Sequence, residues 1–288
     1  MVQLLIKYAL LEPFGVETSL NTLGITLLII ATLCIAAAGN IINDIYDVET
    51  DFINKPDTLI VGKSISEKTA YNLFVIFNIA GVGVGFYLSN SVGKSAFFSI
   101  FVIISALLYV YASYLKQMPI IGNIVVSILV ALSLIIVGIF ELLPSITSLN
   151  QQTQLTFFKI IFDYAVFAFL INLLREITKD IEDIDGDHKA GMNTLPIVIG
   201  RERASKVLFA LSLIPLFAVV YYVIHSLYKN QNAVLYFLIF IIGPLLYISI
   251  KTFTAHTKKE YHHISNILKL VMLFGMLSLL LYLLILKR

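Results

Sequence analysis

Long apolar stretches recur along the whole sequence, and each is long enough to cross a bilayer as a helix. Such a helix needs about 20 apolar residues, because each residue adds about 1.5 Å and the hydrocarbon core is about 30 Å thick. Of the 288 residues, 59% are hydrophobic and 13% are charged, against about 25% charged in soluble proteins. Ten-residue segments of alternating polarity, typical of membrane barrels, are absent from the sequence. The sequence therefore predicts an all-α, polytopic transmembrane helical bundle.

We expect eight full spans and a truncated first helix, within one membrane-embedded domain that covers residues 1–288. The predicted spans are residues 21–50, 66–90, 94–115, 120–142, 155–183, 202–228, 233–253 and 262–286. Residues 2–11 are apolar but too short to cross, and Glu12 and Pro13 end them. Their flanks lack the basic region and cleavage site of a signal peptide. We interpret residues 2–11 as the outer half of a ninth helix, and expect its other half to precede Met1.

Basic residues predict how the bundle is oriented. Thirteen of the 20 Lys and Arg residues flank the side that carries the motif NDIYDVETD, residues 43–51, and five flank the opposite side. Because cytoplasmic loops are enriched in Lys and Arg, we expect the motif side to be cytoplasmic. The sequence has no basic patch interleaved with aromatic residues, so nucleic-acid binding is not expected. Nothing in the sequence indicates an obligate protein partner.

Carboxylates gather at the ends of two predicted helices on the motif side. Eleven of the 18 lie in two groups, Asp44, Asp47, Glu49, Asp51 and Asp57, and Glu176, Asp180, Glu182, Asp183, Asp185 and Asp187. The second group lies in REITKDIEDIDGD and echoes the first, each being followed by a polar, basic loop. This similarity indicates an internal repeat of two related halves.

Within each group the polar side chains are spaced three or four residues apart, which puts them on one helix face. These sets are Asn43, Asp47 and Asp51, and Asp180, Asp183 and Asp187. Like charges at this spacing repel, and ionisable groups near lipid are costly, so a counter-ion is expected. All-oxygen ligands favour Mg²⁺ over zinc or copper, and two acidic faces predict two or more Mg²⁺ ions that bridge a diphosphate. Taken singly, each carboxylate is equally typical of a solvated helix end paired with a nearby lysine.

Both acidic stretches resemble the two Asp-rich signatures of the UbiA superfamily of intramembrane prenyltransferases. The matching segments are NDIYDVETD with the trailing INKP, YASYLKQMPIIGN, and KDIEDIDGDHKAGMNTLPI, and the resemblance covers nearly the whole chain. Among the branches of the superfamily, REITKDIEDIDGD is most similar to the geranylgeranylglycerol-phosphate geranylgeranyltransferases. The resemblance implies a nine-helix bundle that binds a polyprenyl diphosphate through Mg²⁺ and transfers the prenyl group to a lipophilic acceptor.

The resemblance also implies roles for individual residues. It places the Mg²⁺ ligands at Asn43, Asp47, Asp51, Asp183 and Asp187. Catalytic assistance to the departing diphosphate is predicted at Lys116, Tyr111, Lys55, Lys63 and Lys189. Substrate contacts are predicted at Asn43, Tyr46, Tyr114, Asp180 and Arg175. Metals and cations would neutralise the charge that grows on the diphosphate as the allylic C–O bond breaks. Taken alone, each lysine is also typical of a cytoplasmic loop.

The sequence departs from the family pattern at two places. Many members follow the first motif with RPxRP, whereas this chain reads NKPDTLIVGKSIS, which keeps Lys55 and Pro56 but lacks the second Arg-Pro. Lys63 is a candidate substitute. The polar motif with Arg and Asn that begins the family's first helix is also missing, which leaves one wall of the expected pocket incomplete.

The acceptor is the least determined part of the prediction. A geranylgeranyl group and geranylgeranylglycerol phosphate are favoured mostly by the wording of the second motif. Arg175, Lys179, Arg201 and Arg203 make a site for a second phosphate possible, but they are equally typical of topology determinants. The alternatives are an aromatic quinone precursor as acceptor, cyclisation of the prenyl diphosphate without an acceptor, and an ion-coupled transporter. Against transport, the acids lie at helix ends and not at the midplane, and the spans lack paired Gly and Pro breaks.

Overall fold

The computed structural model describes residues 1–54, 56–57 and 59–285, and this part of the chain is helical apart from turns and one isolated β-bridge between Val61 and Ile65. Eight stretches within it are long and apolar enough to cross a membrane, as predicted. They are α2 (Thr22–Tyr46), α4 (Glu67–Ser91), η3–α5 (Ser95–Ser113), α6–η5 (Ile121–Ser145), α7 (Gln151–Lys189), α9–η6 (Arg201–Leu227), α10–η7–α11 (Gln231–Thr254) and α12–α13 (Lys258–Leu283). The predicted all-α membrane bundle is confirmed.

Several spans are composite, because a short 3₁₀ or π turn joins two helical pieces. Their pieces are η3 (Ser95–Phe97), α5 (Phe98–Ser113), α6 (Ile121–Leu142), η5 (Leu143–Ser145), α9 (Arg201–Tyr222), η6 (Val223–Leu227), α10 (Gln231–Phe237), η7 (Leu238–Ile242), α11 (Gly243–Thr254), α12 (Lys258–Leu277) and α13 (Leu279–Ile285). The remaining elements are α1 (Val2–Leu5), η1 (Ile6–Leu11), η2 (Glu12–Phe14), α3 (Val48–Asn54), η4 (Leu115–Gln117) and α8 (Leu195–Ile199).

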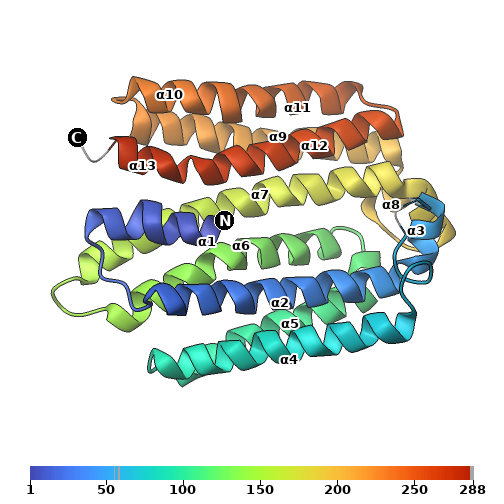
Figure 1. Ribbon diagram of the computed structural model, residues 1–288. Coiled ribbons are helices and arrows are strands. Elements are labelled where there is room, and N and C mark those ends of the chain that lie inside the picture. The colour runs from blue at the N-terminus through green and yellow to red at the C-terminus, as the bar shows by residue number, and fades with distance from the viewer. Residues whose placement is uncertain (55, 58, 286–288) are drawn as a thin grey trace.

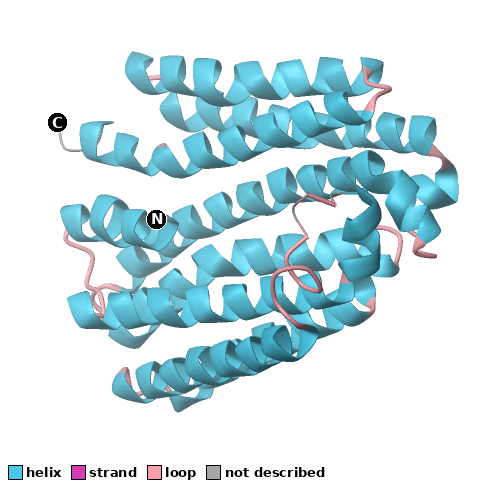
Figure 2. Ribbon diagram, turned by 45° about the vertical axis from the view of Figure 1, so that its right-hand side comes forward, coloured by secondary structure: helices cyan, strands magenta, loops and turns pink. Residues whose placement is uncertain are grey.

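Helix α7 lies between two groups of helices (Figure 1). On one side are α2, α4, α5 and α6, and on the other are α9 to α13. The buried apolar residues form two clusters that follow this division, and α7 contributes to both, with Ile161 in the first and Ile177 in the second. The connecting loops gather at the two ends of the bundle (Figure 2), and α3 and α8 lie together at the end where α7 finishes (Figure 1). This end carries both acidic motifs.

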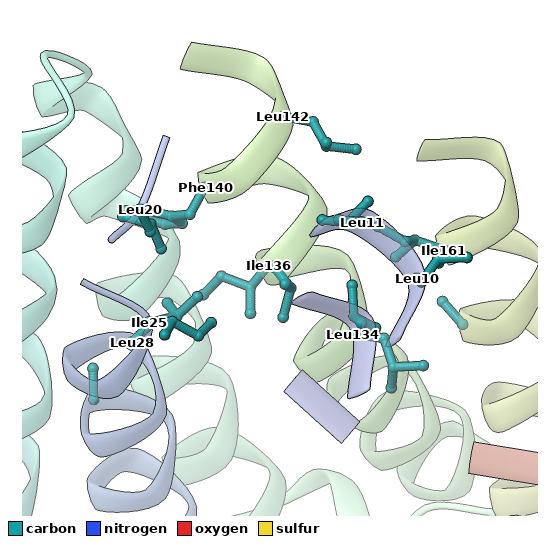
Figure 3. Close-up of a cluster of buried hydrophobic side chains, with 14 of the residues drawn as sticks. Leu10, Leu11, Leu20, Ile25, Leu28, Leu134, Ile136, Phe140, Leu142 and Ile161 are labelled. Carbon is teal, nitrogen blue, oxygen red and sulfur yellow. The ribbon is translucent and has the colours of Figure 1, made fainter. Parts of the chain in front are cut away.

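The amino-terminal segment occupies only the opposite end of the bundle (Figure 1). Leu10 and Leu11 are buried near Leu134 of α6 and Ile161 of α7 (Figure 3). The Lys7 ammonium, which is buried, lies 2.9 Å from Glu141 Oε1 and donates to the Leu20 carbonyl at 2.6 Å. The segment is thus a short helix held at the end opposite the acidic motifs.

The prediction of one continuous helix over residues 21–50 is wrong, because α2 ends at Tyr46 and α3 begins at Val48. Asp47 is non-helical (φ −97°, ψ 2°), and its carboxylate accepts from Asn43 Nδ2 at 2.5 Å. The same carboxylate is also bonded to the Lys116 ammonium, at 2.5 Å. The amides of Asp47 and Asp51 still donate to the carbonyls four residues earlier, at 2.9 and 2.7 Å. The expected common face therefore survives the break.

Candidate active site

A cavity of about 270 Å³ opens where the α2–α3 junction, the end of α7 and the η4–α6 turn meet. It is lined by Asn43, Asp44, Asp47, Thr50, Asp51, Asn54, Tyr111, Lys116, Gly122, Asn123, Glu176, Lys179, Asp180, Asp183, Asp187, Met192 and Thr194. The structure thus brings together the two sets of acids that the sequence places more than 100 residues apart. Seven carboxylates and two lysines line the cavity, so its electrostatic character is strongly acidic.

Lys116 lies in η4, just after α5, and contacts the first motif. Its ammonium lies 2.5 Å from Asp47 Oδ1, and the two side chains are only 8% and 16% exposed. A lysine in this position is held by a charge-assisted bond instead of extending into solvent. Lys116 and Tyr111, both predicted from the family resemblance, therefore line the same cavity as the acids.

A tight turn fixes where Lys116 lies. Gly122, at the start of α6, packs so closely that a Cβ atom there would lie 2.7 Å from Lys116 Cα and 2.8 Å from the Leu115 carbonyl oxygen. Ile120, just before α6, has a φ of +66°, a left-handed conformation that is costly for a β-branched residue. Strained backbone of this kind clusters at functional sites.

The second motif is tied to three neighbouring elements. Asp180 accepts from Asn123 Nδ2 of α6 at 2.8 Å. Asn54, at the end of α3, donates from Nδ2 to the Asp183 carbonyl at 3.2 Å and packs directly against Gly186, where a Cβ atom would overlap its amide. Lys258, in the first turn of α12, lies 3.5 Å from Asp183 Oδ1. These contacts set the position of α7 relative to α3, and with it the separation of the two acidic sets.

Two predicted aromatic contacts and one predicted arginine lie away from the cavity lining. Tyr46 is exposed, and its hydroxyl lies 3.4 Å from that of Tyr109. Tyr114 is also exposed. Arg175 forms an ion pair with Glu176 at 2.7 Å. Because Glu176 does line the cavity, Arg175 sits behind it, and the predicted substrate contacts of these three residues stay predictions.

Two of the remaining predicted lysines, Lys63 and Lys189, are likewise not among the residues that line the cavity. Lys63 donates to the Pro56 carbonyl at 3.4 Å in the loop after α3. Lys189 lines a separate hollow with Asp185 and His188 at the end of α7. Lys55 lies outside the described residues. Their predicted assistance to the diphosphate therefore stays a prediction.

Several cavity residues were not among the predicted site residues. Thr194 is 2% exposed, and its hydroxyl has no hydrogen-bond partner in the described part of the chain. Asn54, Asn123, Glu176 and Thr194 all belong to segments that the family resemblance already covered, INKP, PIIGN, REITKD and MNTLPI. The signal was present in the sequence, but only the packing shows that these side chains face the acids.

The donor set fits Mg²⁺ held together with a phosphate ligand. All the acidic and amide side chains offer oxygen, the donor that Mg²⁺ prefers. In the described ranges, no three His, Cys, Asp or Glu side chains converge on a single ion position. Mg²⁺ commonly uses one or two carboxylates and completes its octahedron with water and substrate phosphates. The excess of acid also means that a diphosphate needs cations in order to enter.

The fold and the cavity together define a multi-pass integral membrane protein with an acidic site at one end of its helices. The chain belongs to the UbiA prenyltransferase family, which matches residues 9–267. It is therefore a prenyltransferase, and the transporter alternative is set aside. A protein of Methanosphaera stadtmanae named digeranylgeranylglyceryl phosphate synthase is 32% identical over 258 residues, 87% of this chain and 86% of that protein. One of the same name from Methanococcoides burtonii is 29% identical, over 96% of this chain and 91% of that protein.

Solved structures share the fold. A UbiA homologue from Aeropyrum pernix superposes with a TM-score of 0.70 at 13% identity, covering 96% of both chains. A UbiA homologue from Archaeoglobus fulgidus, bound to GPP and Mg²⁺, superposes with a TM-score of 0.57 at 18% identity, covering 97% of this chain and 95% of that one.

Proposed function

We propose that this protein transfers a geranylgeranyl group from geranylgeranyl diphosphate to the free hydroxyl of geranylgeranylglyceryl phosphate. The observation that carries the proposal is the name that its full-length relatives share, digeranylgeranylglyceryl phosphate synthase. The wording of the second motif, REITKDIEDIDGD, supports the same branch.

In this proposal Asn43, Asp47 and Asp51 form one face of the diphosphate site, and Asp183 and Asp187 form the other. Two or more Mg²⁺ ions, when bound there, supply the positive charge that anchors the diphosphate and stabilises it as a leaving group. Mg²⁺ prefers an octahedral set of oxygen ligands, and neither acidic face alone provides one. A divalent ion together with the diphosphate would therefore link the two opposed faces.

Lys116 is the side chain we assign to the leaving group. Its ammonium is already held at the cavity by Asp47 at 2.5 Å, so little reorganisation is needed when negative charge grows nearby. Tyr111 is the second candidate, because it lines the same cavity. Lys55, Lys63 and Lys189 follow as further candidates for contacts with the diphosphate.

The reaction breaks one C–O bond and forms another. The bond between C1 of the prenyl chain and the diphosphate oxygen breaks, and the electron pair leaves with the diphosphate. The acceptor hydroxyl oxygen then bonds to C1, and its proton passes to a cavity carboxylate and on to water. Surrounding apolar helices keep water away from the allylic cation. The products are an ether-linked lipid phosphate and inorganic diphosphate.

The acceptor phosphate needs its own cations, and we assign these to Lys179 and Arg175. Lys179 lines the cavity, and Arg175 lies next to it across Glu176. We further propose that the acidic end faces the cytoplasm, because the Lys and Arg excess flanks it.

The test is diphosphate release from geranylgeranyl diphosphate by the purified protein in detergent, with Mg²⁺ and then with EDTA. Three conditions are compared, namely geranylgeranylglyceryl phosphate, 4-hydroxybenzoate and no acceptor. Release that requires both Mg²⁺ and the glycerol phosphate is the expected result. Glu202→Gln, which removes an exposed acid that pairs with Lys206 at the same end, serves as the control for Asp47→Asn.

Other outcomes assign other functions. Release only with 4-hydroxybenzoate would replace the lipid acceptor with an aromatic one. Release without any acceptor, with a cyclic hydrocarbon as product, would identify a cyclase. Equal activity of Asp47→Asn and Glu202→Gln would remove the first acidic face from the mechanism.

A further inference from the structure

A second cavity, of about 590 Å³, lies in the other half of the membrane thickness between α7, α9–η6 and α12. Its volume falls in the range of about 300–1,000 Å³ that is typical of small-molecule sites. Most of the lining is apolar or aromatic, including Phe162, Phe167, Leu170, Val219 and Phe237. A smaller cavity of about 150 Å³ continues from it along Tyr164 and Tyr222.

This cavity is separate from the acidic site. Along α7, Asp163 precedes Asp183 by 20 residues, which corresponds to about 30 Å, the thickness of the hydrocarbon core. When the acidic end lies at one membrane surface, Lys159 and Asp163 therefore lie at the other. The second cavity thus opens at the level of lipid headgroups, and its apolar part extends toward the membrane interior.

Two charged side chains, Lys159 and Asp163, line the cavity but do not form an ion pair with each other. Lys159 and Asp163 are four residues apart on one face of α7, a spacing that normally allows an ion pair. Neither side chain forms an ion pair or a hydrogen bond with the described residues, and both are exposed. At the level of the headgroups, an unpaired cation and an unpaired anion are both available to the charged groups of a lipid.

A π-helical turn forms the opposite edge of the cavity. Helix α9 widens into η6, which places His225 and Ser226 on the lining. The imidazole of His225 stacks on Tyr221, with ring centroids 5.6 Å apart and an interplanar angle of 5°. Isolated π turns occur frequently at functional sites. This edge therefore adds an imidazole and a hydroxyl to the lining that Lys159 and Asp163 share.

We propose that this cavity binds a zwitterionic phospholipid, with the phosphate facing Lys159, the headgroup ammonium facing Asp163 and one chain along Phe162 and Leu170. One lysine and one aspartate give the mouth no net charge at neutral histidine, so a headgroup with both signs is matched and a purely anionic one is not. The aromatic walls match the chain.

The experiment is native mass spectrometry of the delipidated full chain with added dioleoylphosphatidylethanolamine or dioleoylphosphatidylglycerol. The wild-type protein is expected to retain one phosphatidylethanolamine more tightly than phosphatidylglycerol. Lys159→Gln and Asp163→Asn should each weaken this binding about tenfold, as expected for loss of one charge-assisted contact. Ala218→Phe, which fills the lining from α9, should abolish it.

Lys229→Gln is the matched control, because Lys229 lies just after η6 at the same end and contacts the Tyr228 ring, outside the cavity lining. Its binding should equal that of the wild type. Equal retention of the two lipids, or equal weakening by Lys229→Gln and Lys159→Gln, would overturn the proposal. Unchanged binding in Ala218→Phe would place the lipid elsewhere. Thermal melting of each variant in detergent separates these results from misfolding.

Discussion

Gly186 on α7 packs closely against Asn54 on α3, and this contact, called the joint below, connects the two acidic motifs. The substitution Gly186→Ala tests whether the joint sets the spacing of the acids. A Cβ atom at Gly186 would overlap the Asn54 side-chain amide, and the ammonium of Lys258 lies 3.3 Å from the Asn54 carbonyl on the other side. Overpacking of this kind costs about 1–3 kcal/mol, whereas Ala gains about 1 kcal/mol over Gly in a helix. We therefore expect a net loss of up to about 2 kcal/mol in unfolding free energy.

Part of the strain is relieved by moving α3, which carries Asp51. The separation of the acidic faces then changes, and the Mg²⁺ concentration needed for half-maximal prenyl transfer rises. Each 1.4 kcal/mol of lost transition-state stabilisation lowers kcat/KM about tenfold. The assay is prenyl transfer as a function of Mg²⁺, together with the unfolding free energy in mixed detergent micelles.

A double-mutant cycle separates the joint from a general effect of alanine. In an Asn54→Ala background the obstacle is absent, so Gly186→Ala should become neutral or stabilising, with a coupling energy of about 1–3 kcal/mol. Gly83→Ala on α4 is the control, because nothing lies within 4 Å of its Cβ position. If Gly186→Ala is equally destabilising in both backgrounds, the joint does not set the spacing of the acids.

Three further perturbations have defined expectations. Lys116→Gln should lower kcat about 10²–10³-fold in an assay at saturating Mg²⁺, whereas the control Lys206→Gln should have no effect. Equal kcat values for the two variants would exclude Lys116 from leaving-group stabilisation. Asp183→Asn should raise the half-maximal Mg²⁺ concentration about tenfold or more, measured by titration, and an unchanged titration would contradict its role as a ligand. Glu141→Leu leaves the buried Lys7 with only the more distant, half-exposed carboxylate of Glu12, at 3.6 Å, among the described residues. It should cost up to about 3–5 kcal/mol of unfolding free energy, a loss that the added Lys7→Met change largely restores.

Much of the fold could be predicted because membrane helices are a local property of the sequence. Every 20-residue apolar stretch must satisfy its own backbone hydrogen bonds, so its length and composition define a helix without reference to the rest of the chain. The break at Asp47 could not be predicted in this way, because Asp47 also pairs with Lys116, which lies 69 residues further along the chain.

The candidate site could be predicted to the same extent, for features within one segment but not for contacts between segments. Spacing in the sequence placed Asp47 with Asp51, and Asp183 with Asp187, on common faces, and all four line one cavity. Spacing did not show which of the predicted lysines line the cavity, because the long side chain of a lysine can extend in many directions. Lys116 lies against Asp47, whereas Lys189 lies against a different hollow of the same helix end.

By itself, the sequence determined eight apolar spans and two sets of carboxylates at their ends, because both are set by residue type and spacing within one segment. Only the tertiary structure decided which side chains meet. Lys116 and Asp47 are 69 residues apart, and Asn54 and Asp183 are 129 apart. Contacts at such separations arise from how whole helices pack, here through Gly122 and Gly186, where the missing side chain lets backbones and amides approach. The residue types that line the cavity thus follow from the local sequence, and their relative positions follow from how the helices pack.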